Sequence, residues 1–338
     1  MPFTNGVYTE QDLEAAKILN DFLPDKIFDA HVHLYDSSFA PGIAKGSGFR
    51  VSHKADFQDY LDFMKPLFGE RKQIRGNFIT APDETMAMPD SPNRKASVEF
   101  LAGQLTQFPG NVGEVIVGPE DTAEEIEKLL VHPDIRGLKC YHVTAKKKPT
   151  NQASIGEYLP ESAWRVADQR GLVITLHLVK DLALADPANY EYILQMAKRY
   201  PNAKLILAHC ARAFAAWTGI ETVDKLKHLD NVYYDFSAIC ESPAMFQILH
   251  KVGKGKCMWG SDFPVCRMSG KAISLADGFY WISARDLERM SGTNGIHYWQ
   301  YATENLMAVR QACLMLDMTD DQIEDLFWNN AMTLFGLT

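Results

Sequence analysis

Short apolar runs with strand character recur along the chain and are separated by segments of helical periodicity. The strand-like runs cover residues 27–34, 74–80, 113–118, 135–141, 172–179, 204–209, 232–237 and 256–260. Apolar residues at helical spacing mark residues 9–22, 56–68, 95–108, 121–130, 162–170, 190–200, 223–229 and 243–252. Because strands and helices alternate strictly, the pattern predicts a parallel sheet with helices packed outside it.

The number and spacing of these units predict a particular α/β fold. Eight β/α units within about 250 residues match the size of a (β/α)8 TIM barrel. A doubly wound open sheet is the alternative. However, none of the predicted strands is followed by the Gly-x-Gly-x-x-Gly motif that is typical of dinucleotide-binding open sheets. We predict one domain over residues 1–338, with a helical extension, 1–26, before the barrel. Long loops are expected after strands 1, 4 and 8, over residues 35–72, 142–160 and 264–300.

Composition and charge narrow the class of partner. The chain has 34 Lys and Arg residues against 43 Asp and Glu residues, a net charge of −9 that argues against nucleic acid and anionic membranes. The first residues show neither a basic segment nor an apolar one typical of secretion, and no apolar run is long enough to span a bilayer. The six cysteines are scattered without a Cys-x-x-Cys pair, as expected for reduced thiols. We therefore expect a cytoplasmic protein that acts on a small molecule.

Two histidines close the first predicted strand, in the stretch Asp29-Ala30-His31-Val32-His33. Residues i and i+2 of a strand project from the same face, so His31 and His33 are expected to point the same way. Imidazole nitrogens at that spacing can share a Zn²⁺, Fe²⁺ or Mn²⁺ ion. Taken alone, the pair is more typical of an ordinary strand whose histidines bond only to the backbone.

Further polar residues close other predicted strands. In a TIM barrel the active site lies at the carboxyl ends of the strands. His177 ends the fifth run, His209 the sixth and Asp262 follows the eighth, while Lys139 and Tyr141 share one face of the fourth. Imidazoles and one carboxylate converging at this edge predict a catalytic metal site with a position open to water. Asp262 is the carboxylate placed to take a proton from that water.

These residues lie in segments that resemble the amidohydrolase superfamily, specifically its amidohydrolase-related branch of TIM-barrel metal enzymes. The matching segments are Phe28–Leu34, Gly137–Lys139, Leu176–His177, Ile206–His209, Asn231–Ser237, Trp259–Pro264 and Asn330–Gly336, in family order. The branch contains hydrolases of C–N and C–O bonds, lactonases and non-oxidative decarboxylases. The resemblance therefore implies a metal-dependent enzyme without naming one reaction.

The resemblance also implies roles for the residues at the strand ends. His31, His33, His177 and Asp262 would hold one metal ion, usually zinc, and His209 would be a nearby acid or electrophile. In binuclear relatives a lysine at the position of Lys139 is carbamylated and bridges two metals. We favour one metal, with Lys139 as a cation facing a substrate carboxylate. A lysine reaching past the barrel rim to solvent is the structural alternative.

Two more residues are candidates for substrate binding. Arg212 follows His209 by three residues, so its guanidinium is expected to grip a carboxylate or, equally, to bind backbone carbonyls of a loop. Tyr141 is expected to hydrogen-bond the substrate or to fill the barrel.

The predicted reaction is hydrolysis of an amide, ester or lactone in a small, carboxylate-bearing metabolite. The alternative is decarboxylation, which would use the same ligands. Homo-oligomerisation is expected only because it is a habit of the family.

Overall fold

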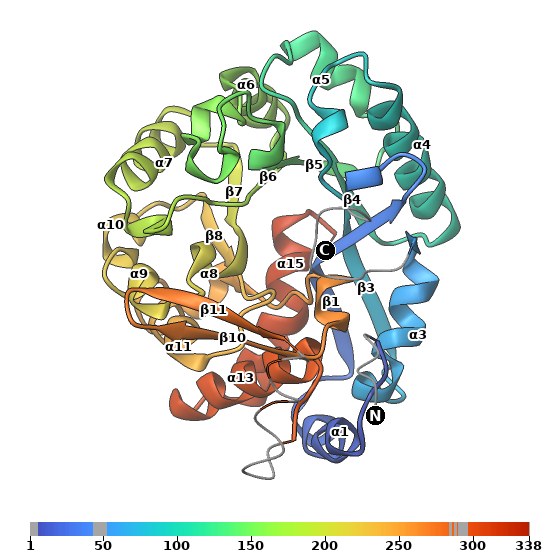
Figure 1. The fold of residues 1–338 in the computed structure, drawn as a ribbon, viewed down its shortest axis with the longest axis vertical. Coiled ribbons are helices and arrows are strands. Elements are labelled where there is room, and N and C mark those ends of the chain that lie inside the picture. The colour runs from blue at the N-terminus through green and yellow to red at the C-terminus, as the bar shows by residue number, and fades with distance from the viewer. Residues whose placement is uncertain (1–5, 43–52, 284–285, 287–288, 290–296, 338) are drawn as a thin grey trace.

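The computed structural model describes residues 6–42, 53–283, 286, 289 and 297–337. Its main sheet has nine strands in the order β2-β1-β3-β4-β5-β6-β7-β8-β9 (Figure 1). The strands are β1 (Lys26–Asp36), β2 (Lys54–Ala55), β3 (Gln73–Thr80), β4 (Val112–Ile116), β5 (Ile135–Cys140), β6 (Val173–Leu176), β7 (Lys204–Leu207), β8 (Val232–Asp235) and β9 (Cys257–Met258). All neighbours pair in parallel except β2, which pairs antiparallel with the end of β1.

The sheet closes on itself between β1 and the segment that follows β9. The backbone N–H of Ala30 donates to Trp259 O (3.0 Å), and that of His33 donates to Phe263 O (2.8 Å). Val32 and Phe263 form a parallel bridge at the same seam. The predicted (β/α)8 TIM barrel is thereby confirmed, and the open sheet is excluded.

Helices surround the barrel, mostly where helical periodicity predicts them (Figure 1). They are α1 (Glu10–Phe22), α3 (Phe57–Phe68), α4 (Pro92–Gln107), α5 (Ala123–Leu129), α6 (Glu161–Arg170), α7 (Pro187–Arg199), α8 (Ala208–Arg212), α9 (Ala216–Ile220), α10 (Val223–Leu226), α11 (Ser242–Lys251), α13 (Tyr301–Met315), α14 (Asp320–Glu324) and α15 (Asn330–Leu334). Local capping explains several starts. The Thr9 side chain, for instance, accepts from the N–H of Asp12 (3.1 Å), and Asp12 accepts in return from the N–H of Thr9 (2.8 Å). None of the described helices is long and apolar enough to cross a bilayer.

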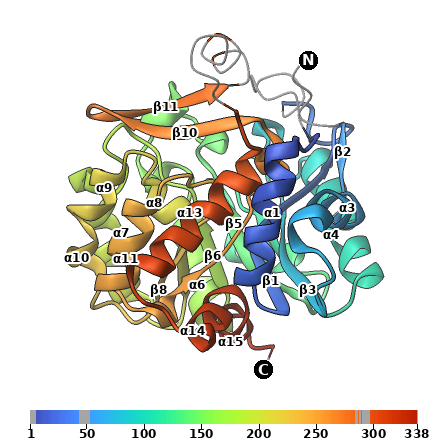
Figure 2. The same ribbon diagram turned by 90° about the horizontal axis from the view of Figure 1, so that it is seen from below.

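The two ends of the barrel differ. Near the N-terminal end of the strands the interior is apolar, filled by Phe28, Ala30, Val112, Val173, Ile206 and Met258 and covered by Trp328 and Phe335 of the C-terminal helical segment. On the opposite side of the molecule lies a hairpin of β10 (Gly270–Leu275) and β11 (Gly278–Ser283) (Figure 2). The sequence segment 264–300 was expected to be a loop; its described part contains this hairpin, which provides one wall of the cavity described below.

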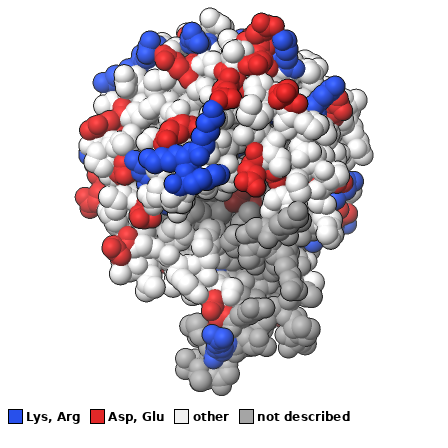
Figure 3. All heavy atoms as spheres, turned by 45° about the horizontal axis from the view of Figure 1, so that its top comes forward, with Lys and Arg blue, Asp and Glu red and all other residues white. Residues whose placement is uncertain are grey.

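Charged side chains of both signs are interspersed over the face shown in Figure 3. Many form exposed pairs, such as Lys128 with Glu124 (2.7 Å). Exposed pairs of this kind contribute little to stability, typically 0–1 kcal/mol. The stability of the fold therefore depends chiefly on the apolar interior and on the layer between barrel and helices.

Candidate metal centre and active site

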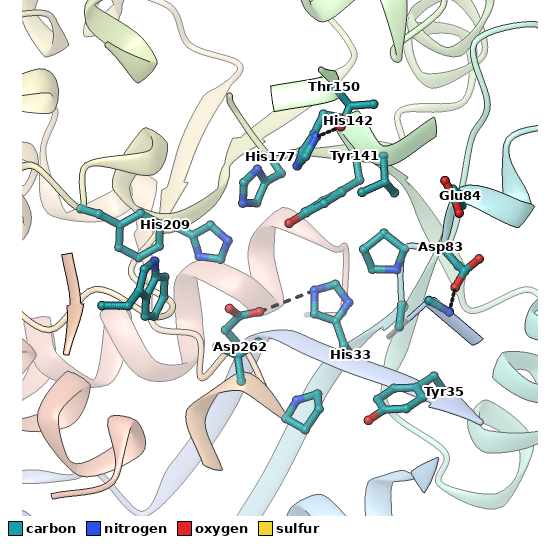
Figure 4. A pocket seen from close by; sticks show the side chains of 18 of the residues that line it. His33, Tyr35, Asp83, Glu84, Tyr141, His142, Thr150, His177, His209 and Asp262 are labelled. Carbon is teal, nitrogen blue, oxygen red and sulfur yellow. Dashed lines mark hydrogen bonds and ion pairs between the residues drawn. The ribbon is translucent and has the colours of Figure 1, made fainter. Parts of the chain in front are cut away.

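A cavity of about 670 Å³ opens at the carboxyl ends of the barrel strands (Figure 4). Its lining combines titratable and apolar side chains. The titratable ones are His33, Tyr35, Asp83, Glu84, Tyr141, His142, Lys148, His177, His209 and Asp262; the apolar ones are Ala81, Pro82, Val143, Phe214, Pro264, Val265 and Trp281. His31 does not line the cavity but is fully buried next to His33. The predicted metal ligands and catalytic residues thus gather at one place.

His31, His33 and Asp262 form a compact cluster of potential ligand atoms. The two Nε2 atoms are 3.2 Å apart, and Asp262 Oδ1 lies 3.7 Å from His31 Nε2 and 3.5 Å from His33 Nε2. Burial lowers the pKa of both histidines and raises the pKa of Asp262, since each charged form loses its hydration. Neutral imidazoles with their lone pairs turned to one point are the form that binds metal.

Asp29 ties the first strand to the segment that carries Asp262. Its Oδ1 accepts from the N–H of His31 (3.0 Å) and from that of Ser261 (2.9 Å). The pairing of β1 with β3 shifts register between Asp29 and Val32. The shift lets Ala30 stay in the barrel interior while His31 and His33 also turn inward. Asp29 lies in the stretch Asp29-Ala30-His31-Val32-His33 of the first predicted strand, but no role was predicted for it.

Asp235, at the end of β8, connects His31 with His209. Its Oδ2 accepts from His31 Nδ1 (2.9 Å), and its Oδ1 accepts from the N–H of His209 (3.0 Å). Burial raises the pKa of Asp235, but the charge of His31 and its hydrogen bond lower the pKa by a larger amount. The pKa of Asp235 therefore lies below its ordinary value, and the carboxylate is ionised. Ser237 Oγ lies between Asp235 and His209, 2.8 Å from His209 Nδ1. Neither Asp235 nor Ser237 was singled out from the sequence.

His209 begins a turn that is left-handed over four consecutive residues. The φ angles of His209, Cys210, Ala211 and Arg212 are 58°, 53°, 61° and 60°. None of the four is glycine, and each left-handed residue costs about 1–2 kcal/mol. Such strain persists only where surrounding contacts impose it, and it occurs most often at functional sites. Here the turn directs His209 into the cavity (Figure 4).

Lys139, on β5, is fully buried and is not among the residues that line the cavity. Its Nζ lies 3.1 Å from His31 Nε2. Burial lowers the pKa of Lys139, although Glu114, Asp235 and Asp262 oppose this shift. This hydrogen bond uses the Nε2 lone pair of His31, which a bound metal ion would need, so the two would exclude each other. Lys139 therefore lies immediately next to the candidate metal site. Its predicted contact with a substrate carboxylate stays a prediction.

His177 and Tyr141 line the cavity beside His209. The ring of His177 is 5.0 Å from that of His209 and 4.4 Å from that of Tyr141. His177 Nδ1 is buried without a hydrogen-bond partner in the described part of the chain. Within that same part, His177 does not join the His31, His33 and Asp262 cluster. Its role as the fourth ligand therefore stays a prediction.

Arg212 is held at the side of the cavity. Its Nη1 donates to the carbonyl of Lys180 (3.0 Å), and its guanidinium lies 5.2 Å from the ring of Phe279 on the hairpin. This is the loop-binding arrangement that the sequence left open, and Arg212 is not among the residues that line the cavity.

Lys148, in the loop after β5, is the one Lys or Arg among the residues that line the cavity in the described structure. It is exposed, and its neighbours Lys146 and Lys147 lie near Glu120 and Glu157, respectively. The sequence shows only a run of three lysines, which is typical of a solvated surface. Its place at the cavity depends on the path of the loop and cannot be read from spacing.

The residues present fit a divalent ion. The hydrogen bond from His31 Nδ1 to Asp235 fixes the tautomer that leaves Nε2 as a lone pair. Two such nitrogens and a carboxylate oxygen within 3.7 Å of one another form a donor set suited to Zn²⁺, Mn²⁺ or Fe²⁺. A second group of potential ligands consists of His31, His209 and Asp235. Its members are already linked by hydrogen bonds, from His31 Nδ1 to Asp235 and from the backbone N–H of His209 to Asp235.

The family profile described as amidohydrolase matches residues 28–337. The chain belongs to the amidohydrolase family. No protein with a curated description matches it. The predicted superfamily is thereby confirmed, and the enzyme is expected to be metal-dependent.

Solved structures similar to this amidohydrolase include members of two reaction classes. One, from Pseudomonas putida, is provisionally described as a 2-pyrone-4,6-dicarboxylic acid hydrolase (15% identity, 93% of this chain and 98% of that chain, TM-score 0.55). The 5-carboxyvanillate decarboxylase from Sphingomonas paucimobilis matches with 14% identity, 93% and 100% coverage and a TM-score of 0.55. The 2,6-dihydroxybenzoate decarboxylase from Rhizobium matches with 11% identity, 93% and 99% coverage and a TM-score of 0.57. At these identities the likeness shows the shared fold alone.

Proposed function

We propose that this amidohydrolase is a metal-dependent hydrolase that cleaves an amide, ester or lactone bond of a small, carboxylate-bearing molecule. The observation that supports it most is the convergence of His31, His33 and Asp262 beside a cavity that His209 also lines. These three ligands, with His177 as the predicted fourth, would hold one divalent ion, for which zinc is our first choice.

Two residues would move protons in this reaction. When bound, the ion supplies Lewis acidity, which lowers the pKa of water and polarises a carbonyl. Asp262 would take the proton of the attacking water and return it to the leaving group. His209 would transfer a proton at the ring nitrogen that faces the cavity. Both side chains are nearly excluded from solvent, so electrostatic interactions there act with little screening.

The cavity lining supports a small substrate that has an apolar part and an anionic part. Phe214, Trp281 and Val265 offer an apolar wall for a carbon skeleton. Lys148 would attract a carboxylate at the mouth. Asp83 faces the cavity too, but its carboxylate is occupied by the N–H groups of Gly42 (2.6 Å) and Thr85 (2.9 Å).

Decarboxylation is the second candidate reaction, because structures of decarboxylases resemble this fold as closely as that of the hydrolase does. A decarboxylase would use the same ligands to anchor its substrate and would deliver a proton to carbon.

The six cysteines are all free and buried, which supports our proposal that the enzyme works in the reducing cytoplasm.

The deciding experiment measures both products on one panel of lactones, esters, amides and aromatic or unsaturated carboxylic acids. The zinc- or manganese-loaded enzyme should release acid from at least one ester, amide or lactone, and His33→Ala should abolish that release. Release of CO₂ from a carboxylic acid without hydrolysis of any other compound would favour the decarboxylase. Equal activity of wild type and His33→Ala would contradict the metal-dependent mechanism in both forms.

A further inference from the structure

The buried groups Asp235 and Ser237 make a chain of hydrogen bonds that ends on His209. Asp235 Oδ1 accepts from three donors: the N–H of His209 (3.0 Å), the N–H of Ser237 (3.1 Å) and the Ser237 hydroxyl. Its Oδ2 accepts from His31 Nδ1. Asp235 and Ser237 are fully buried, so no water competes for these bonds.

The positions of the protons in this chain follow from which atoms can donate. The Ser237 hydroxyl has one proton, and this proton goes to Asp235. The two oxygens next to His209 Nδ1 are Ser237 Oγ (2.8 Å) and the Ser237 carbonyl (3.0 Å). The carbonyl cannot donate, and the hydroxyl has already given its proton to the carboxylate. His209 Nδ1 must therefore be the donor, and it carries the ring proton.

The other ring nitrogen of His209 then has a lone pair. Figure 4 shows this nitrogen turned toward the space between His177, His33 and Asp262. A neutral ring in this tautomer accepts a proton from the cavity and does not donate one.

The same chain also holds the backbone of the left-handed turn. Asp235 binds the backbone N–H of His209, the residue at which positive φ values begin, while Ser237 binds its ring. One carboxylate thus fixes both the main chain and, through the hydroxyl, the side chain of His209. By its second oxygen it orients His31 as well.

We propose that Asp235 and Ser237 are positioning residues that hold His209 in its Nδ1–H tautomer, so that His209 Nε2 serves as a proton acceptor facing the cavity. In the reaction, Asp262 would take the first proton of the attacking water and Nε2 would take the second, and Nδ1–H would keep its bond to Ser237. The ionised Asp235 would stabilise the resulting imidazolium. Nε2 would then release this proton to solvent, while Asp262 returns the first proton to the leaving group. This revises the resemblance-based expectation that His209 begins as an acid, and it rests on the proposed function only for the reaction itself.

The tautomer can be measured without a substrate. We would label the enzyme with ¹⁵N-histidine and record long-range ¹H–¹⁵N correlations on the metal-free and zinc-loaded protein at neutral pH. His209→Gln identifies the signals of His209 among the 10 histidines. One protonated nitrogen, assigned as Nδ1, is expected for His209. A proton on Nε2, or on both nitrogens, would overturn the proposal whether or not the enzyme proves to be a hydrolase.

Ser237→Ala tests the positioning role, with Ser97→Ala as a matched control. Ser97 is equally buried, on α4, and its hydroxyl donates to Arg94 O (2.7 Å), away from the cavity. Removing the residue that orients a functional side chain by a hydrogen bond typically lowers activity 10- to 100-fold, so kcat should fall by roughly that factor in Ser237→Ala. KM and metal content should stay near those of wild type. Ser97→Ala should keep its kcat, and Ser237→Thr, which retains the hydroxyl, should recover most of the activity.

A kcat for Ser237→Ala as high as that of Ser97→Ala would refute the positioning role. Failure of Ser237→Thr to recover activity, while it folds and binds metal, would refute it as well. Asp235→Asn should lower metal content in addition to kcat, because Asp235 also orients His31. If Ser237→Ala does not fold, the tautomer measurement on wild type and a kcat of Asp235→Asn near wild type would still be able to refute the proposal.

Discussion

Asp262 is the side chain that the proposed mechanism uses twice, once for the ion and once for the proton. Its Oδ1 is within 3.7 Å of both histidine Nε2 atoms, and 6% of its surface is exposed, on the cavity side. An asparagine at this position would keep the size and one oxygen ligand, but its amide could not accept the proton of water.

We therefore expect Asp262→Asn to retain most of its metal and to lose at least about 10²-fold in hydrolysis rate. Elemental analysis and kcat measured on the same preparation check both halves of this prediction. Its Tm should stay within a few degrees of wild type, because barrel stability comes mainly from the apolar interior. Hydrolysis at the wild-type rate would show that Asp262 is not the proton carrier.

Lys148 is the residue that we expect to contact a substrate carboxylate. Lys148→Ala should raise KM by roughly two- to fivefold for an anionic substrate and should leave kcat within about twofold of wild type, since an exposed charge pair contributes at most about 1 kcal/mol of binding energy. Lys147, next to it, is not among the cavity-lining residues and provides the control. Equal KM values for the two alanine variants would remove Lys148 from the binding site.

Sequence reasoning located the residues that end strands, but not those that act through hydrogen bonds. His31 and His33 were predictable because a strand repeats every two residues, and the barrel brings strand ends together. Asp29 and Asp235 lie in the recognised segments, yet their roles appear only once their partners, Ser261 and His209, come close in space. A buried carboxylate two residues from a strand-end histidine or hydroxyl is the signal that would have suggested them.

At the scale of elements, strands were predicted better than the segments after β9. Each predicted run contains a strand of the barrel, although four runs were two to four residues too long because apolar residues continue into the buried loops. The hairpin β10–β11 was missed because its strands bury little, and residues 301–315, which form α13, were not assigned to any element. The alternation of apolar and polar residues is weak in this hairpin, because it covers the opening of the cavity and buries little against the hydrophobic core.

Arg212 links this hairpin to the barrel, and the link can be tested. Arg212→Ala removes a charged hydrogen bond to Lys180 O and a cation–π contact with Phe279, contributions on the order of 1–3 kcal/mol together. Amides of β10 and β11 should then exchange hydrogen faster, by roughly five- to a hundredfold if the whole contribution is lost on opening, and KM should rise more than kcat falls. Arg170→Ala, which loses a surface pair with Glu127, is the control. Unchanged exchange in Arg212→Ala would show that the hairpin holds its place without this link.

At the scale of the whole molecule, the barrel interior changes from apolar to polar along its axis. Between the apolar layer and the cavity lies Glu114, which is fully buried on β4. Its Oε1 accepts from Asn77 (2.7 Å) and Thr175 (2.8 Å), while Oε2 has no hydrogen-bond partner among the described residues. Burial raises the pKa of Glu114 to about 7, because ionisation there would place a charge in a medium of low polarity.

A raised pKa means that the folded state binds the proton of Glu114 more tightly than the unfolded chain does. Its contribution to stability is therefore complete below the ordinary pKa of about 4.3 and is lost as pH rises toward 7. The charge of Lys139 nearby opposes part of this loss. The sign is opposite to that of an ordinary surface carboxylate in an ion pair, which stabilises more as pH rises.

Glu114→Gln removes this titration while it keeps an oxygen for Asn77 and Thr175. We expect the free energy of unfolding of wild type, relative to Glu114→Gln, to fall by on the order of 1–3 kcal/mol between pH 5 and pH 8. Urea unfolding of metal-free protein at several pH values measures this difference. Glu99→Gln, at an exposed position on α4, should track wild type at every pH. A difference that stays constant, or that grows in favour of wild type as pH rises, would mean that Glu114 is ionised in the folded enzyme and that the Lys139 charge outweighs burial.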